Sequence, residues 1–109
     1  DLLCEIPVDF VLAALGGDID VPSPDGKKLR ISVPEGCQNE RQFRLKGKGM
    51  PVLQSRKYGD LFVEIHVEIP KDLNKKQINL LKEFEKEASK NNSPESNDYI
   101  SRLKKIFKN

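Results

Sequence analysis

Apolar and polar residues alternate along short stretches of the first 70 residues, a pattern typical of β-strands with one buried face. The alternation predicts five strands, over residues 2–8, 18–22, 28–33, 42–45 and 61–69. The last strand places aliphatic side chains on one face and His66, between two glutamates, on the other. Pro7 predicts that the first strand lies at a sheet edge or ends nearby. After Asp9, six apolar residues predict a short helix that Gly16 ends.

The second and third predicted strands form a hairpin whose register follows from burial. For the apolar side chains to share one face, Val21 must lie opposite Leu29. This pairing requires a three-residue loop over residues 24–26, with its glycine in a left-handed conformation. The same register places Asp20 opposite Arg30, which predicts a cross-strand ion pair.

From Asn74 onward, apolar residues recur with a helical period. Asn74 and Gln77 have the spacing of a capping box, and an apolar stripe follows as far as Ala88. After a linker over residues 89–93, Pro94 begins a second helix. Five apolar side chains follow one side of this second helix: Tyr99, Ile100, Leu103, Ile106 and Phe107.

This terminal stripe predicts an interaction surface. A helix of about thirteen residues is marginal in water by itself, and burying each large apolar side chain is worth ~1.5–3 kcal/mol. The stripe must therefore dock on its own domain or on another chain. Because the linker has no hydrophobic anchor and two-fold dimers are the commonest small oligomers, we expect a second copy as the partner. The alternative is a helix folded back on its own body.

The length of 109 residues allows one domain, or a domain with an appendage. Charged residues make up 33% of the chain, and no apolar run approaches the ~20 residues that span a bilayer. Cys4 and Cys37 are too few for a disulfide scaffold, and together with the single His66 they do not form a zinc site of the usual spacing. We therefore expect a reducing, cytoplasmic setting. Because the chain opens inside a predicted strand, we also expect it to be a piece of a longer protein.

Basic residues gather between positions 27 and 57, where nine lysines and arginines accompany two acids. A nucleic-acid-binding β module using the basic segment 41–57 is therefore the alternative function, although stacking aromatics are sparse there. Residues 46–49 (Lys-Gly-Lys-Gly) lack the spacing of a phosphate-binding loop and predict a bend between strands. A polar loop is predicted over residues 52–59.

The candidate side chains do not form a catalytic set. A general acid or base needs a nucleophile or a second titrating group within reach. Cys4 falls on the apolar face of its strand, and His66 lies on the polar face of another, where we expect it to be solvated. Nothing in the chain resembles the strained nucleophile turn of a serine hydrolase. We therefore expect a protein that is not an enzyme.

Six short motifs follow one another in a specific order and spacing. They are residues 3–10 (Leu-Cys-Glu-Ile-Pro-Val-Asp-Phe), 13–17 (Ala-Ala-Leu-Gly-Gly), 21–26 (Val-Pro and Asp-Gly), 33–36 (Val-Pro-Glu-Gly), 43–51 (Phe-Arg-Leu-Lys-Gly-Lys-Gly-Met-Pro) and 59–61 (Gly-Asp-Leu). Together they closely resemble the second C-terminal domain of DnaJ-type heat-shock cochaperones, over essentially the whole chain. Residues 74–81 resemble the helix that follows this domain, and the lysine-rich amphipathic end resembles the bacterial dimerisation tail.

The resemblance implies a mostly β fold with α-helices: a small β-sandwich-like domain of the DnaJ C-terminal peptide-binding type, with one short internal helix and two C-terminal helices. It implies a β-rich substrate-binding-type domain over residues 1–72, a helix packed on or after it over residues 73–90, and a dimerisation helix over residues 91–109. In the family, the C-terminal domains hold non-native polypeptide, the tail joins two copies, and the J domain stimulates ATP hydrolysis by a DnaK-type chaperone.

The chain lacks both the His-Pro-Asp motif of a J domain and the Cys-x-x-Cys-x-Gly-x-Gly repeats that bind zinc in the family. We therefore expect no cofactor here, with zinc only in the Cys-rich region of the full-length protein. The expected partners are a second copy, unfolded polypeptide and, through the full-length protein, a DnaK-type chaperone, with no membrane. For client binding, strand addition along residues 2–8 or 18–22 would use Ile6, Val8, Ile19 and Val21, which are equally placed to be core.

Overall fold

The computed structural model describes residues 1–51, 57–89 and 91–107. The chain divides into two compact units between Lys71 and Asp72. We call residues 1–71 the β unit and residues 72–109 the helical unit. Part of the polar loop predicted over residues 52–59, and one position of the predicted linker at residue 90, lie outside the described residues.

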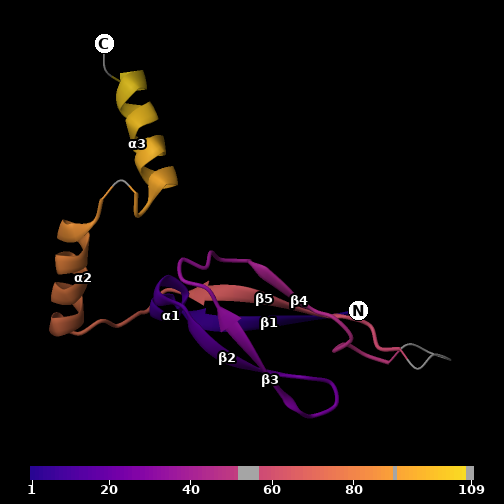
Figure 1. The fold of residues 1–109 in the computed structure, drawn as a ribbon. Helices are drawn as coiled ribbons and strands as arrows, with labels where there is room; N and C mark the ends of the chain where they lie inside the picture. Colours follow the sequence, from indigo (N-terminus) through magenta and orange to yellow (C-terminus); the bar gives the residue numbers. More distant parts are fainter. Residues whose placement is uncertain (52–56, 90, 108–109) are drawn as a thin grey trace. The chain divides into compact units, whose positions relative to one another are not determined.

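The β unit contains two sheets (Figure 1). One has three strands in the order β1 (Leu2–Asp9), β5 (Leu61–Glu68) and β4 (Gln42–Leu45), and the other pairs β2 (Gly17–Pro22) with β3 (Lys28–Val33). β1 runs parallel to β5 along its whole length, whereas β4 runs antiparallel to β5. β1 is an edge strand, as Pro7 predicts.

The hairpin of β2 and β3 has the predicted register. Val21 lies opposite Leu29, and Asp20 lies opposite Arg30, with 3.4 Å between the Arg30 Nε and an Asp20 carboxylate oxygen. Ser23 donates to the carbonyl of Lys27 at 2.9 Å and closes the loop over residues 24–26. The loop glycine has a φ of 84°, a left-handed conformation that a side chain disfavours. Burial of one face therefore fixes both the pairing and the loop length.

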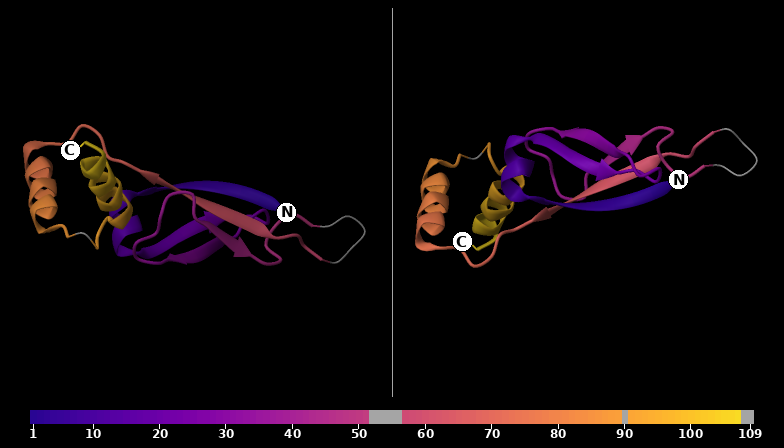
Figure 2. Two further views of the ribbon diagram at one scale, coloured as in Figure 1. Left: turned by 90° about the horizontal axis from the view of Figure 1, so that it is seen from above. Right: turned by 90° about the horizontal axis from the view of Figure 1, so that it is seen from below.

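A short helix, α1 (Phe10–Leu15), follows β1 directly. Asp9 caps it by accepting a hydrogen bond from the N–H of Leu12 at 2.8 Å, and Gly16 ends it. Figures 1 and 2 show α1 at one end of the strands and the start of the chain at the other. The buried side chains of the core come from both sheets, from α1 and from the segment after β3: Val8, Ala13, Val21, Ile31, Val33, Cys37, Leu61, Val63 and Ile65.

The glycine-rich segment after β4 forms the predicted bend. Gly49 donates to the carbonyl of Gly59 at 2.9 Å, and Gly59 donates to the carbonyl of Met50 at 2.8 Å. A Cβ atom at Gly49 would collide with the carbonyl of Asp60, so the close approach requires glycine. The bend thus allows the chain to turn back and pair with itself. A phosphate-binding loop would be followed by a helix, and residues 57–71 contain none.

The helical unit contains α2 (Lys75–Glu87) and α3 (Pro94–Phe107). α2 begins with the predicted capping box, in which Asn74 accepts from the N–H of Gln77 at 2.8 Å and Gln77 accepts from the N–H of Asn74 at 2.9 Å. Neither helix has a buried residue within its described length. No helix in the described parts of the chain is long and apolar enough to cross a membrane.

The predicted fold class, a small β domain with one internal helix and two C-terminal helices, is confirmed. One strand boundary differs from the prediction. β5 ends at Glu68, and Ile69, which the alternation placed on the buried face, lies beyond the strand with 69% of its surface exposed. Pro70 follows directly and cannot donate a ladder hydrogen bond, which accounts for the early end.

Candidate functional site

The four residues predicted for client binding fall into two groups. Val8 and Val21 belong to the core, with 6% and 0% of their surfaces exposed. Ile6 and Ile19 are half-buried and pack against that core from β1 and β2. Ile6 and Ile19 therefore keep part of their surface accessible to solvent, whereas Val8 and Val21 do not.

β1 and β2 each have one edge to which no other described strand is paired. α1 connects the two strands and exposes Val11 and Leu15, at 48% and 72%. An unpaired strand edge offers backbone N–H and C=O groups to an extended polypeptide, and nearby apolar side chains add contact area. These edges, with α1 between them, form the candidate client surface. Periodicity alone did not single out Val11 or Leu15.

Within the described part of the basic segment 41–57, the side chains of Arg41 and Arg44 contact other residues of the β unit; residues 52–56, which include Arg56, lie outside the described residues. The Nε of Arg44 donates to a carboxylate oxygen of Asp60 at 2.6 Å, and the N–H of Gly47 donates to the other at 3.0 Å. The guanidinium of Arg41 lies over the ring of Phe43, 5.0 Å from its centroid. The hydrogen bond from Gly47 and then that from Arg44 hold the pKa of Asp60 below its ordinary value of 3.8.

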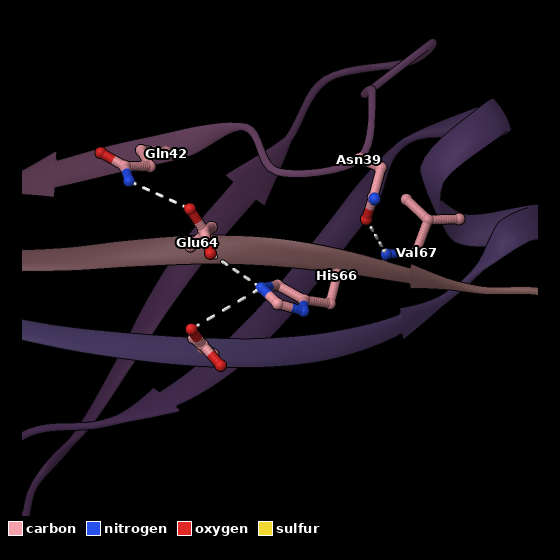
Figure 3. Close-up of polar contacts among 6 residues, drawn as sticks. Asn39, Gln42, Glu64, His66 and Val67 are labelled. Atoms are coloured by element: carbon pink, nitrogen blue, oxygen red, sulfur yellow. Dashed lines mark hydrogen bonds and ion pairs between the residues drawn. The ribbon is translucent and has the colours of Figure 1, made fainter.

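His66 lies on the polar face of β5, as the sequence predicts, with 45% of its side chain exposed. Its Nε2 lies 2.8 Å from a carboxylate oxygen of Glu64, while Gln42 donates to the other oxygen at 3.1 Å (Figure 3). The hydrogen bond to Glu64 raises the pKa of His66, and the same bond, with that from Gln42, lowers the pKa of Glu64. Glu5 on β1 completes a cluster of two carboxylates and one imidazole, which contains no cysteine.

The five residues predicted for dimerisation all lie on α3. Four are exposed: Tyr99 at 63%, Ile100 at 49%, Ile106 at 67% and Phe107 at 81%, while Leu103 is half-buried. On the opposite side of the helix, Arg102 pairs with Asp98 at 2.9 Å, one turn earlier. α3 therefore carries an apolar side whose residues are not buried within the described chain.

A family model, described as the DnaJ C terminal domain, matches residues 1–70, which include all five strands and α1. The chain belongs to the DnaJ C-terminal domain family. The six motifs therefore identified the family correctly. The matched region ends close to the boundary between the β unit and the helical unit.

Curated relatives extend the DnaJ likeness through the helical unit. Proteins named Chaperone protein DnaJ from Rhizobium etli, Agrobacterium fabrum and Brucella canis are 53%, 52% and 51% identical to this chain over 107 residues. The matched region covers 98% of this chain and 28% of each relative. The chain thus spans little more than a quarter of the length of these DnaJ proteins.

Proposed function

We propose that this chain is the non-catalytic C-terminal part of a DnaJ-like cochaperone, which joins two copies and helps to hold unfolded polypeptide for a DnaK-type chaperone. The family of the β unit and the printed name of its relatives support this assignment. In this proposal residues 1–72 form the substrate-binding-type domain, residues 73–90 a following helix and residues 91–109 the dimerisation helix. The chain itself performs no reaction. We assign the protein to the cytoplasm, where thiols such as Cys4 and Cys37 remain reduced.

The observation that carries the proposal is the exposed apolar side of α3. Four of its five large apolar residues are between 49% and 81% exposed. Fully burying each such side chain contributes ~1.5–3 kcal/mol. A partner that covers the stripe therefore adds several such contributions to the free energy of binding. A second copy is the occupant we propose, because an amphipathic helix is complementary to itself across a two-fold axis.

Dimerisation would give client binding its strength. Two β units joined through their C-terminal helices would contact one flexible polypeptide at two points. The second contact then becomes intramolecular, and the effective concentration rises without any new contact. Each contact would be an extended segment added to the edge of β1 or β2, with Ile6 and Ile19 contributing apolar surface.

Sedimentation equilibrium on the whole chain and on a version cut after Asn92 tests this function. We expect a dimer for the whole chain at tens of micromolar, and a monomer once α3 is removed. The cut falls before Pro94, outside the β unit, and therefore leaves its core intact. If both versions of the chain are monomers, or if both are dimers, the proposed role of α3 is contradicted.

A further inference from the structure

A mixed carboxylate and imidazole cluster lies on the face of the three-stranded sheet that is turned away from the core. The parallel register of β1 and β5 places Glu5 beside Glu64 and Pro7 beside His66. Because side chains alternate along a strand, Glu5, Glu64 and His66 all project from the same face. The pairing thus brings together residues that are about sixty positions apart in the sequence.

Within this cluster the three potential ligand atoms converge. Of the residues that the structure describes, Glu5, Glu64 and His66 each offer one ligand atom, and these atoms lie within 4.8 Å of one another. The Nε2 of His66 is 2.8 Å from Glu64 and 4.0 Å from Glu5. A metal bonded to nitrogen and oxygen at about 2.0–2.2 Å holds neighbouring ligand atoms roughly 3–4 Å apart. Small side-chain rotations therefore suffice to convert the cluster into a coordination sphere.

Glu64, whose side chain is the least exposed of the three, accepts a hydrogen bond from a residue outside the cluster. Gln42, on β4, donates to one oxygen of Glu64 at 3.1 Å and turns the other oxygen toward His66 (Figure 3). Only 19% of the Glu64 side chain is exposed, against 60% for Glu5. Hydrogen bonds that orient a ligand in this way commonly support metal affinity. Glu5, the exposed member, has the freedom to close on a bound ion.

We propose that Glu5, Glu64 and His66 form a surface site for a divalent first-row transition ion such as Zn²⁺. An imidazole with carboxylates suits such ions, whereas Mg²⁺ and Ca²⁺ prefer oxygen ligands alone. Water would complete the coordination, because the cluster faces solvent. The site contains no cysteine ligand, unlike the cysteine-based zinc sites of the family, and it needs neither Cys4 nor Cys37.

Such an ion would join β1 to β5. Glu5 belongs to β1, the edge strand, whereas Glu64 and His66 belong to β5, the central strand. A ligand that binds the folded form alone stabilises it by an amount that grows with the logarithm of the ligand concentration once this exceeds the Kd. The ion would therefore hold the edge strand in place and raise the unfolding temperature of the β unit.

Zn²⁺ titration of the chelator-treated whole chain tests the site, followed by NMR of the histidine ring. His66 is the only histidine, so its ring signals are unambiguous. We expect these signals to shift and saturate at one equivalent, together with a rise in the unfolding temperature. Glu64→Gln should weaken Zn²⁺ binding about tenfold or more. If the Glu64→Gln variant fails to fold, Glu5→Gln at the exposed position replaces it in the same measurement.

Glu68→Gln is the matched control, because it removes the same charge from the same strand without removing a proposed ligand. We expect it to bind Zn²⁺ as the wild type does. Equal weakening in Glu68→Gln and Glu64→Gln would indicate general electrostatic attraction and overturn the site. Unchanged His66 signals in the wild type, or unchanged affinity in Glu64→Gln, would overturn it as well.

Discussion

The β unit and the helical unit use apolar residues in opposite ways. The β unit buries nine side chains between two sheets, four of them with less than 2% of their surface exposed. The helices of the helical unit are also amphipathic, yet none of their described residues is buried. Ile78, Leu80 and Phe84 on α2 are between 39% and 66% exposed, and four of the five large apolar residues of α3 are between 49% and 81% exposed. The first region is stabilised by its own core, whereas the apolar sides of the second remain exposed in the described residues.

This contrast separates two kinds of substitution. A change in the core of the β unit should affect folding and leave association intact, as long as the protein remains folded. A change on the apolar side of α3 should affect association and leave the folding of the β unit intact. The predictions below test this separation, beginning with the largest expected effect.

Leu61→Ala should destabilise the β unit by about 2–5 kcal/mol, because it opens a cavity among side chains that are fully buried. Urea unfolding followed by circular dichroism measures the loss. The folded variant should still sediment as a dimer. Loss of the dimer under conditions where the β unit remains folded would show that the two regions depend on each other.

Ile6→Ser should weaken the binding of a labelled, reduced and alkylated protein, which stays unfolded, by about five- to thirtyfold. That range corresponds to one or two kcal/mol of lost contact. Leu3→Ser is the matched control: it lies on the same strand but on the opposite face, and it is 54% exposed. Fluorescence anisotropy measures both affinities. Equal effects of the two variants would remove Ile6 from the client surface.

Asp60→Asn should destabilise the β unit in a pH-dependent way. Because the pKa of Asp60 is lowered by the N–H of Gly47 and by Arg44, its ionised form contributes stability above its ordinary pKa of 3.8. This contribution is lost as the pH falls through the lowered value. The difference in unfolding free energy between wild type and Asp60→Asn should therefore be constant near neutral pH and shrink in acid.

The control for this pH dependence is Asp20→Asn, whose partner Arg30 is largely exposed. An exposed ion pair of this kind contributes little to stability. Urea unfolding at several pH values should therefore show a smaller effect for Asp20→Asn throughout. A pH-independent effect of Asp60→Asn would mean that its hydrogen-bond geometry, rather than its charge, stabilises the bend.

Local features of the fold could be predicted from the sequence because short-range rules determine them. The hairpin register follows from the side-chain period of two, and the caps at Asp9 and Asn74 follow from three-residue spacings. The parallel pairing of β1 with β5 could not be predicted in this way. It joins segments almost sixty residues apart, and each strand pattern is compatible with several neighbours.

The same limit applies to the functional residues. The sequence placed Glu64 and His66 on one face of a strand, but Glu5 joins them only through the β1–β5 register. The sequence also predicted Val8 and Val21 as client-binding residues together with Ile6 and Ile19. Alternation identifies which side chains face inward, but it does not tell how deeply each one is buried. The stripe of α3 was predictable in full because it lies within one helix.

The most direct test of α3 as the joining element is sedimentation equilibrium of Leu103→Asp beside Ser101→Asp. Both variants add one negative charge to α3, the first in the apolar stripe and the second on the opposite side. A charge without a partner in a buried seam is strongly destabilising. We predict a monomer for Leu103→Asp and a dimer for Ser101→Asp, with unchanged unfolding of the β unit in both. A Leu103→Asp chain that remains dimeric would place the contact elsewhere and contradict the proposed role of α3.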